Sequence, residues 1–100
     1  MPPDFEWDAG NQAKCQKHGV SIAEIEALFL SRLFVGRDER HSQEEDRYVA
    51  VGRSDVGRAI LVIYTLRVRA GLACVRPLSA RYMHQKEMRW YEEIAAKNHN

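Results

Sequence analysis

Two arginines in the second half of the chain have the most distinctive chemistry. Arg76 and Arg81 lie in the run Arg-Pro-Leu-Ser-Ala-Arg, where the pattern predicts that a strand gives way to a helix. Each guanidinium can donate two parallel hydrogen bonds to an oxyanion, so a fixed pair suits a phosphate. We interpret the pair as candidate clamps for nucleic acid. The alternative is a structural pair that bonds to carboxylates such as Glu87.

Further cationic residues extend this candidate set. Arg47 and Arg58 each stand at the start of an expected strand, where they are either substrate-binding residues or solvated charges at strand ends. Lys17 and His18 stand at the end of an expected helix. They are candidates for proton transfer because the histidine pKa lies near physiological pH. The alternative is that both side chains only complement the dipole of the helix C-terminus.

His84 is the preferred general acid or base. It follows Arg81 by three residues, which places both side chains on one face of an expected first helical turn. Glu87 lies three residues further on. It either orients His84 or pairs with Arg81 or a nearby lysine on the helix surface.

Three aromatic residues are considered for stacking on RNA bases, as aromatic side chains do in single-strand recognition. Trp90 falls on the apolar stripe of the expected C-terminal helix, so we expect it in the core. Tyr91 lies off that stripe. Trp7 follows Phe5 by two residues, the spacing of side chains on one face of an extended segment. Tyr91 and Trp7 are therefore either substrate-binding residues or core residues.

Cleavage of RNA by its own 2′-hydroxyl defines which groups a site must supply. A base takes the hydroxyl proton, cations hold the charge on phosphorus, and an acid protonates the leaving 5′-oxygen. The candidates for these catalytic roles are Arg76, Arg81, His84, Lys17 and Glu87. No carboxylates cluster at metal-ligand spacing and the four histidines are scattered, so we expect neither a metal nor another cofactor.

The composition is that of a folded domain, and the 100 residues are expected to form one. No apolar run approaches the length that crosses a bilayer, and no signal peptide is visible. We therefore expect a cytoplasmic protein with no membrane contact. In that compartment Cys15 and Cys74 are expected to be buried thiols.

The net charge of +1 conceals an asymmetry between the two halves of the chain. Residues 1–52 hold 6 Lys and Arg against 10 Asp and Glu, whereas residues 53–100 hold 9 against 4. Either one surface meets a polyanion, or the two halves face each other across the fold. The sequence leaves both interpretations open.

The pattern of elements predicts an α+β fold with N-terminal helices, a three- to four-stranded, mainly antiparallel sheet and a C-terminal helix. Ser21 and Glu24 have capping-box spacing. Residues 60–64 are apolar on both faces and predict a central strand, and Pro77 predicts an edge or a bulge. The expected elements are an edge strand or extended arm at 5–8, helices at 11–18 and from 21, strands at 33–35, 47–51, 59–66 and 72–78, a mobile loop at 36–46 that includes His41, and a helix at 81–97.

Several short strings resemble a known family when they are taken in order. They are Phe5-Glu6-Trp7-Asp8, Lys17-His18-Gly19-Val20, Asp46-Arg47, Gly57-Arg58 and Ser79-Ala80-Arg81, followed by a helix with Glu87 and Tyr91. Over about residues 5–93 the chain resembles the BrnT family of ribonuclease toxins. The resemblance implies a RelE-like fold, RNA cleavage that stops translation, and a BrnA-type antitoxin as partner. It also implies that operator DNA is bound only through the antitoxin complex.

The leading hypothesis is a metal-independent endoribonuclease toxin that cleaves messenger RNA. The alternative is a toxin-like binding module that docks a partner protein without catalysis, since obvious acid–base residues are scarce. Direct binding of duplex DNA has less support, because the basic residues do not gather on one recognition helix.

Overall fold

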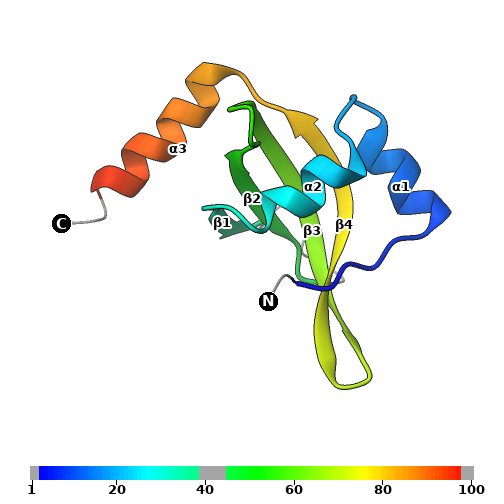
Figure 1. The fold of residues 1–100 in the computed structure, drawn as a ribbon. Coiled ribbons are helices and arrows are strands. Elements are labelled where there is room, and N and C mark those ends of the chain that lie inside the picture. Colours follow the sequence, from blue (N-terminus) through cyan, green and yellow to red (C-terminus); the bar gives the residue numbers. More distant parts are fainter. Residues whose placement is uncertain (1–2, 39–44, 98–100) are drawn as a thin grey trace.

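The computed structural model describes residues 3–38 and 45–97. A four-stranded antiparallel sheet in the order β1-β2-β3-β4 carries helices on both faces (Figure 1). The predicted α+β class is confirmed. The elements are α1 (Ala9–Gln16), α2 (Ile22–Leu28), β1 (Phe34–Arg37), β2 (Tyr48–Arg53), β3 (Ala59–Arg69), β4 (Leu72–Tyr82) and α3 (Gln85–Lys97).

The two N-terminal helices begin at reciprocal side-chain caps. Asp8 accepts a hydrogen bond from the Asn11 backbone N–H, and the Asn11 side chain accepts one from the Asp8 N–H. Ser21 and Glu24 form the predicted capping box, with both hydrogen bonds at 3.0 Å. These pairs satisfy backbone donors that a helix leaves without intrahelical partners. Gly19, with φ of 91°, forms the turn after α1.

The core lies on both sides of the sheet, and alternation along the strands decides which side a residue faces. Ile60, Val62 and Tyr64 of β3 pack with residues of α1 and α2, such as Cys15 and Ile25. The other side is smaller: Val51, Ala59 and Met88 are buried there, and Phe34, Leu61 and Tyr91 pack around them. The predicted central position of residues 60–64 is confirmed, because β3 lies between β2 and β4.

An irregularity interrupts the pairing of β3 with β4. Ile63 pairs with Ser79 and Tyr64 pairs with Pro77, so Leu78 is an extra residue in β4. Such a bulge shifts by one the alternation of the residues that follow it. Pro77, which has no N–H to donate, therefore lies beside a bulge as the sequence predicted.

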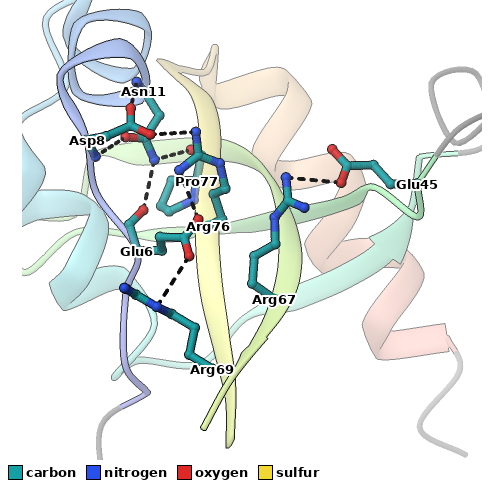
Figure 2. Close-up of polar contacts among 8 residues, drawn as sticks. All are labelled: Glu6, Asp8, Asn11, Glu45, Arg67, Arg69, Arg76 and Pro77. Carbon is teal, nitrogen blue, oxygen red and sulfur yellow. Dashed lines mark hydrogen bonds and ion pairs between the residues drawn. The ribbon is translucent and has the colours of Figure 1, made fainter. Parts of the chain in front are cut away.

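The N-terminal segment runs beside β4 as an extended arm. Phe5 forms a parallel bridge with Val75, in which the Glu6 N–H donates to the Val75 carbonyl and the Val75 N–H donates to the Asp4 carbonyl, both at 2.8 Å. The buried Asn11 side chain joins this arm to the sheet. Its amide donates to the Glu6 and Pro77 carbonyls, each at 2.9 Å (Figure 2).

Several predicted boundaries are wrong, and strand pairing explains the largest errors. β4 continues to Tyr82 instead of stopping at residue 78, because residues 79–82 pair with β3. Arg81 therefore lies in a strand, and α3 begins four residues later than expected. β3 extends to Arg69, and β1 includes Gly36 and Arg37, which were expected in a loop. The rest of that expected loop lies largely outside the described residues, His41 included.

Smaller differences occur at the two ends of α1 and at the start of β2. α1 begins at Ala9, two residues earlier than expected, because Asp8 is its N-cap, and it ends at Gln16. β2 begins at Tyr48, so Arg47 precedes the strand that it was expected to open. The Arg47 carbonyl accepts a hydrogen bond from the Asp38 N–H at 2.7 Å.

The two cysteines are buried free thiols, as predicted. Burial raises the pKa of the Cys15 thiol to about 11. No helix within residues 3–38 and 45–97 combines the length and the apolar character needed to span a membrane.

We expect the Asn11→Ala substitution to lower the free energy of unfolding by about 2–4 kcal/mol, because it leaves two carbonyls and the Asp8 N–H without this partner. Urea denaturation measures the change. Gln12→Ala in the same helix is the matched control and should cost under about 0.5 kcal/mol. Equal losses in the two variants would contradict the role of Asn11 as the joint between arm and sheet.

Candidate functional site

The bulge in β4 brings Arg76 and Arg81 to the same face of the sheet. Arg76 pairs with Thr65, and Arg81 pairs with Leu61. Thr65 and Leu61 are four residues apart on one strand, so they share a face, and so do their partners. This is the α3 face, because Leu61 packs in the cluster around Met88. The two pairs are separated by about 13 Å along the strands.

Arg76 is held by two carboxylates of the N-terminal arm (Figure 2). Its Nη1 lies 3.1 Å from Glu6 Oε1, and its Nη2 lies 2.9 Å from Asp8 Oδ2. The Asp8 carboxylate, and then Glu6, raise the pKa of Arg76, whose side chain is only 19% exposed. The geometry favours the structural interpretation of Arg76, with partners that the sequence did not indicate.

Arg81 forms a bidentate pair with Glu87 at the start of α3. Its Nη1 and Nη2 lie 3.2 and 3.1 Å from Glu87 Oε1 and Oε2. The guanidinium lowers the pKa of Glu87, and the His84 backbone N–H, which donates to Oε1 at 3.2 Å, lowers it further. The predicted pairing of Glu87 with Arg81 is confirmed. The contact of Glu87 with His84 is through the backbone N–H of the histidine.

On the opposite face, Arg58 stacks on the last residue of β4. Its guanidinium carbon lies 3.4 Å from the centroid of the Tyr82 ring. The Tyr82 hydroxyl donates to Glu24, with distances of 2.8 and 2.9 Å to the two carboxylate oxygens. The same hydroxyl lies 3.4 Å from the Gly19 carbonyl. The turn after α1 is thereby joined to the end of β4.

The remaining polar candidates stand at this same end of the sheet. The ladder of β3 and β4 closes with a hydrogen bond from the Met83 N–H to the Ala59 carbonyl at 2.9 Å. Arg58 immediately precedes β3, and His84 follows Met83 after the end of β4. Both residues are exposed. Lys17 is the C-cap of α1, two residues before Gly19, and is also exposed.

We refer to these residues as the ladder-end cluster. They share a position at the end of the β3–β4 ladder where β4 leads into α3, and this is the end at which Figure 1 shows the α1–α2 turn close to β4. Arg58 lies on the α1 and α2 side, Arg81 lies on the α3 side, and His84 lies between them in the chain. The members are Lys17, Glu24, Arg58, Arg81, Tyr82, His84 and Glu87.

Other candidates lie away from this cluster. Arg47 precedes Tyr48, which pairs through Tyr64 with Pro77 in the middle of β4. The Trp7 indole N–H donates to Glu26 at 2.9 Å, and its ring is part of the core on the α1 and α2 side.

The structure resolves the two alternatives for Tyr91 and overturns the expectation for Trp90. Tyr91 packs against Phe34 with ring centroids 6.5 Å apart and belongs to the smaller core. Trp90, expected in the core, is 56% exposed. The face of α3 that is directed at the sheet carries Met88 and Tyr91, so Trp90 lies off that face.

Sequence reasoning missed Tyr82 and the second role of Glu24. Glu24 was identified only as a capping residue, and Tyr82 was placed in a helix. One signal in the sequence was available: in a strand, residues two apart share a face, so Tyr82 would lie on the same side of β4 as Ala80. Within residues 3–38 and 45–97, no three His, Cys, Asp or Glu side chains are grouped so that they could hold a metal ion.

The hydrogen bonds of Glu24 give a pH-dependent contribution to stability. The Ser21 N–H, and then the Tyr82 hydroxyl, hold the pKa of Glu24 below its usual 4.5. A carboxyl whose pKa is lower in the folded state stabilises the protein above its unfolded pKa, and this stabilisation is lost as the pH falls through the folded pKa. We expect the difference in free energy of unfolding between the wild type and Glu24→Gln to be largest near neutral pH and to shrink below about pH 4.5. Urea titrations across this range measure it, and a difference independent of pH would contradict the assignment.

A comparison with protein families identifies the family to which the sequence belongs. Residues 7–87 match the family model described as the ribonuclease toxin, BrnT, of type II toxin–antitoxin systems. A search of the curated proteins finds no match. Because the family match covers well over half of the 100 residues, the chain belongs to the BrnT family of ribonuclease toxins.

Proposed function

We propose that this chain is a metal-independent endoribonuclease toxin that cleaves messenger RNA at the ladder-end cluster by attack of the 2′-hydroxyl. Membership of the BrnT family supports the general class, a ribonuclease toxin of a type II pair with an antitoxin as its partner. The observation that supports the site is that Arg58, Arg81 and His84 all stand at the end of the β3–β4 ladder. The guanidiniums approach this end from opposite faces of the sheet.

The first step of the proposed reaction is an exchange of partners at Arg81. The side chains of Arg81 and Glu87 are 46% and 40% exposed, and exposed ion pairs contribute only about 0–1 kcal/mol. An RNA phosphate therefore replaces the Glu87 carboxylate on the guanidinium at low cost. Until the substrate binds, the ion pair with Glu87 keeps the Arg81 guanidinium oriented.

The second step uses the carboxylate that the phosphate has displaced. While Arg81 is bound to it, Glu87 is a poor base, because the guanidinium lowers its pKa. Release from Arg81 returns the pKa towards its usual value, and Glu87 then accepts the 2′-hydroxyl proton. The 2′-oxygen attacks phosphorus, the bond to the 5′-oxygen breaks, and His84 donates a proton to that leaving oxygen. Arg58 and Lys17 hold the charge on the phosphate.

Loss of Arg81 tests this mechanism directly. We expect Arg81→Ala to reduce cleavage of single-stranded RNA by about 10²-fold or more in buffer with a metal chelator, because the phosphate loses its bidentate donor. Gel electrophoresis of labelled RNA measures the rate. Arg89→Ala on the exposed surface of α3 is the matched control. Undiminished cleavage by a folded Arg81→Ala variant would refute the role of Arg81.

A second candidate function is a binding module that docks a partner protein without catalysis. The observation that favours it is that Arg76 and Arg81 are both already bound by carboxylates. Expression without the antitoxin separates the two functions: a ribonuclease toxin arrests growth, and the wild type and Arg81→Ala then differ, whereas a binding module leaves growth unchanged in both.

The partner and the compartment complete the proposal. The antitoxin is proposed to be of the BrnA type, and operator DNA is bound only through the toxin–antitoxin complex. The target is messenger RNA, so we place the activity in the cytoplasm.

A further inference from the structure

The stack of Arg58 on Tyr82 leaves the hydrogen-bond donors of the guanidinium available. A guanidinium that lies on an aromatic ring uses its flat face, and its N–H groups point outward in the plane. Arg58 is exposed, and within the described residues it has no carboxylate at ion-pair distance. Arg76 and Arg81 differ from it in this respect, because carboxylates already occupy their donors.

The ring beneath Arg58 is itself fixed to α2. Its hydroxyl donates to both oxygens of Glu24. One of these oxygens also accepts the Ser21 N–H at 3.0 Å, and the Ser21 hydroxyl oxygen accepts the Glu24 N–H. The hydrogen bond to Glu24 raises the pKa of Tyr82, which keeps the phenol protonated and able to donate. A chain of contacts thus runs from the N-terminus of α2 through Tyr82 to the guanidinium.

The charge of Glu24 reinforces this arrangement from a distance. The carboxylate is bound to the phenolic hydroxyl, so it polarises the ring and increases its attraction for a cation on the ring face. Glu24 binds Ser21 and Tyr82 and forms no ion pair with Arg58 within 4.0 Å, although the charge of Arg58 contributes to lowering the Glu24 pKa. It therefore supports the orientation of the guanidinium without replacing a phosphate on it.

From this geometry we infer that Tyr82 and Glu24 are positioning residues that hold Arg58 in place to bind an RNA phosphate at the ladder end. The inference rests on the proposed function and deepens it, since it adds two residues that act through Arg58. A long side chain otherwise loses rotamer freedom when it binds a ligand, and the prior stacking removes part of that entropic cost.

A double-mutant cycle tests the inference. The probe is a single-stranded RNA in which every 2′-hydroxyl is methylated, because this RNA binds without being cleaved by its own 2′-oxygen. We expect Arg58→Ala to weaken binding and to reduce the slope of log Kd against log salt by about 0.7, the value for one phosphate contact on a single strand. Tyr82→Leu should weaken binding by about threefold to tenfold in the wild-type background and by much less in the Arg58→Ala background.

Conservative variants separate positioning from folding. Arg58→Lys keeps the charge and loses the planar stack, and Tyr82→Phe keeps the ring and loses the bond to Glu24. Each should bind with an affinity between that of the wild type and that of Arg58→Ala. Melting temperatures are recorded for every variant, because a structural role of Tyr82 would lower them in both backgrounds without coupling to Arg58 in Kd. If Tyr82→Leu does not fold, Tyr82→Phe and Glu24→Gln complete the cycle in its place.

The outcomes distinguish the inference from the proposed function. Additive losses in the cycle, an unchanged salt slope in Arg58→Ala, or absence of binding by the wild type would overturn the positioning role. Binding with the expected coupling but no cleavage of unmodified RNA would overturn the catalytic proposal and leave the phosphate site in place. Cleavage of unmodified RNA without coupling between Tyr82 and Arg58 would overturn the positioning role and leave the catalytic proposal in place.

Discussion

The bulge at Leu78 is the constraint on which the arrangement of the arginines depends. In an unbroken strand, residues five apart point to opposite faces, and Arg76 would then lie on the α1 and α2 side if Arg81 kept its place. The extra residue removes this difference, so both side chains lie on the α3 face. Tyr82 directly follows Arg81 and therefore lies on the opposite face, where the turn after α1 and Glu24 can reach it. The inserted residue thus decides the face of Arg76 relative to Arg81, and with it the partners that Arg76 can reach.

The charge asymmetry of the sequence is resolved in part by ion pairs between the two halves of the chain. Glu6 and Asp8 bind Arg76, Glu6 also lies 3.7 Å from Arg69 Nε, and Glu45 lies 3.3 Å from Arg67 Nη2 (Figure 2). Much of the positive excess of the second half is thus met by the first half. This supports the interpretation in which the two halves face each other across the fold. At the ladder end, by contrast, Arg58 stacks on the Tyr82 ring and has no carboxylate at ion-pair distance among the described residues.

The parts of the fold that local signals determine were predictable from the sequence. The capping box of Ser21 and Glu24, the central strand at 60–64, the bulge beside Pro77 and the pairing of Arg81 with Glu87 all follow from spacing over a few residues. The errors lie where contacts distant in sequence decide the outcome. Residues 79–82 have no local signal strong enough to distinguish strand from helix, and pairing with β3 decides it. The partners of Arg76 and of Tyr82 come from the N-terminal arm and from α2, which no pattern within β4 could indicate.

The three arginines around β4 differ in what a phosphate must displace, and this difference supports the proposed position of the reaction. At Arg76 a phosphate would have to replace two carboxylates, one of which is the N-cap of α1, so binding there would also weaken the helix start. At Arg81 it would replace one exposed carboxylate, that of Glu87, which is the base in the proposed mechanism. At Arg58 it displaces none within the described residues, since the ring occupies only the face of the guanidinium. The cost of phosphate binding therefore falls from Arg76 to Arg81 to Arg58, towards the sheet end that also carries His84 and Lys17. The proposed site therefore combines the two arginines whose donors a phosphate can reach at the lowest cost, Arg58 and Arg81, with the carboxylate that it releases from Arg81.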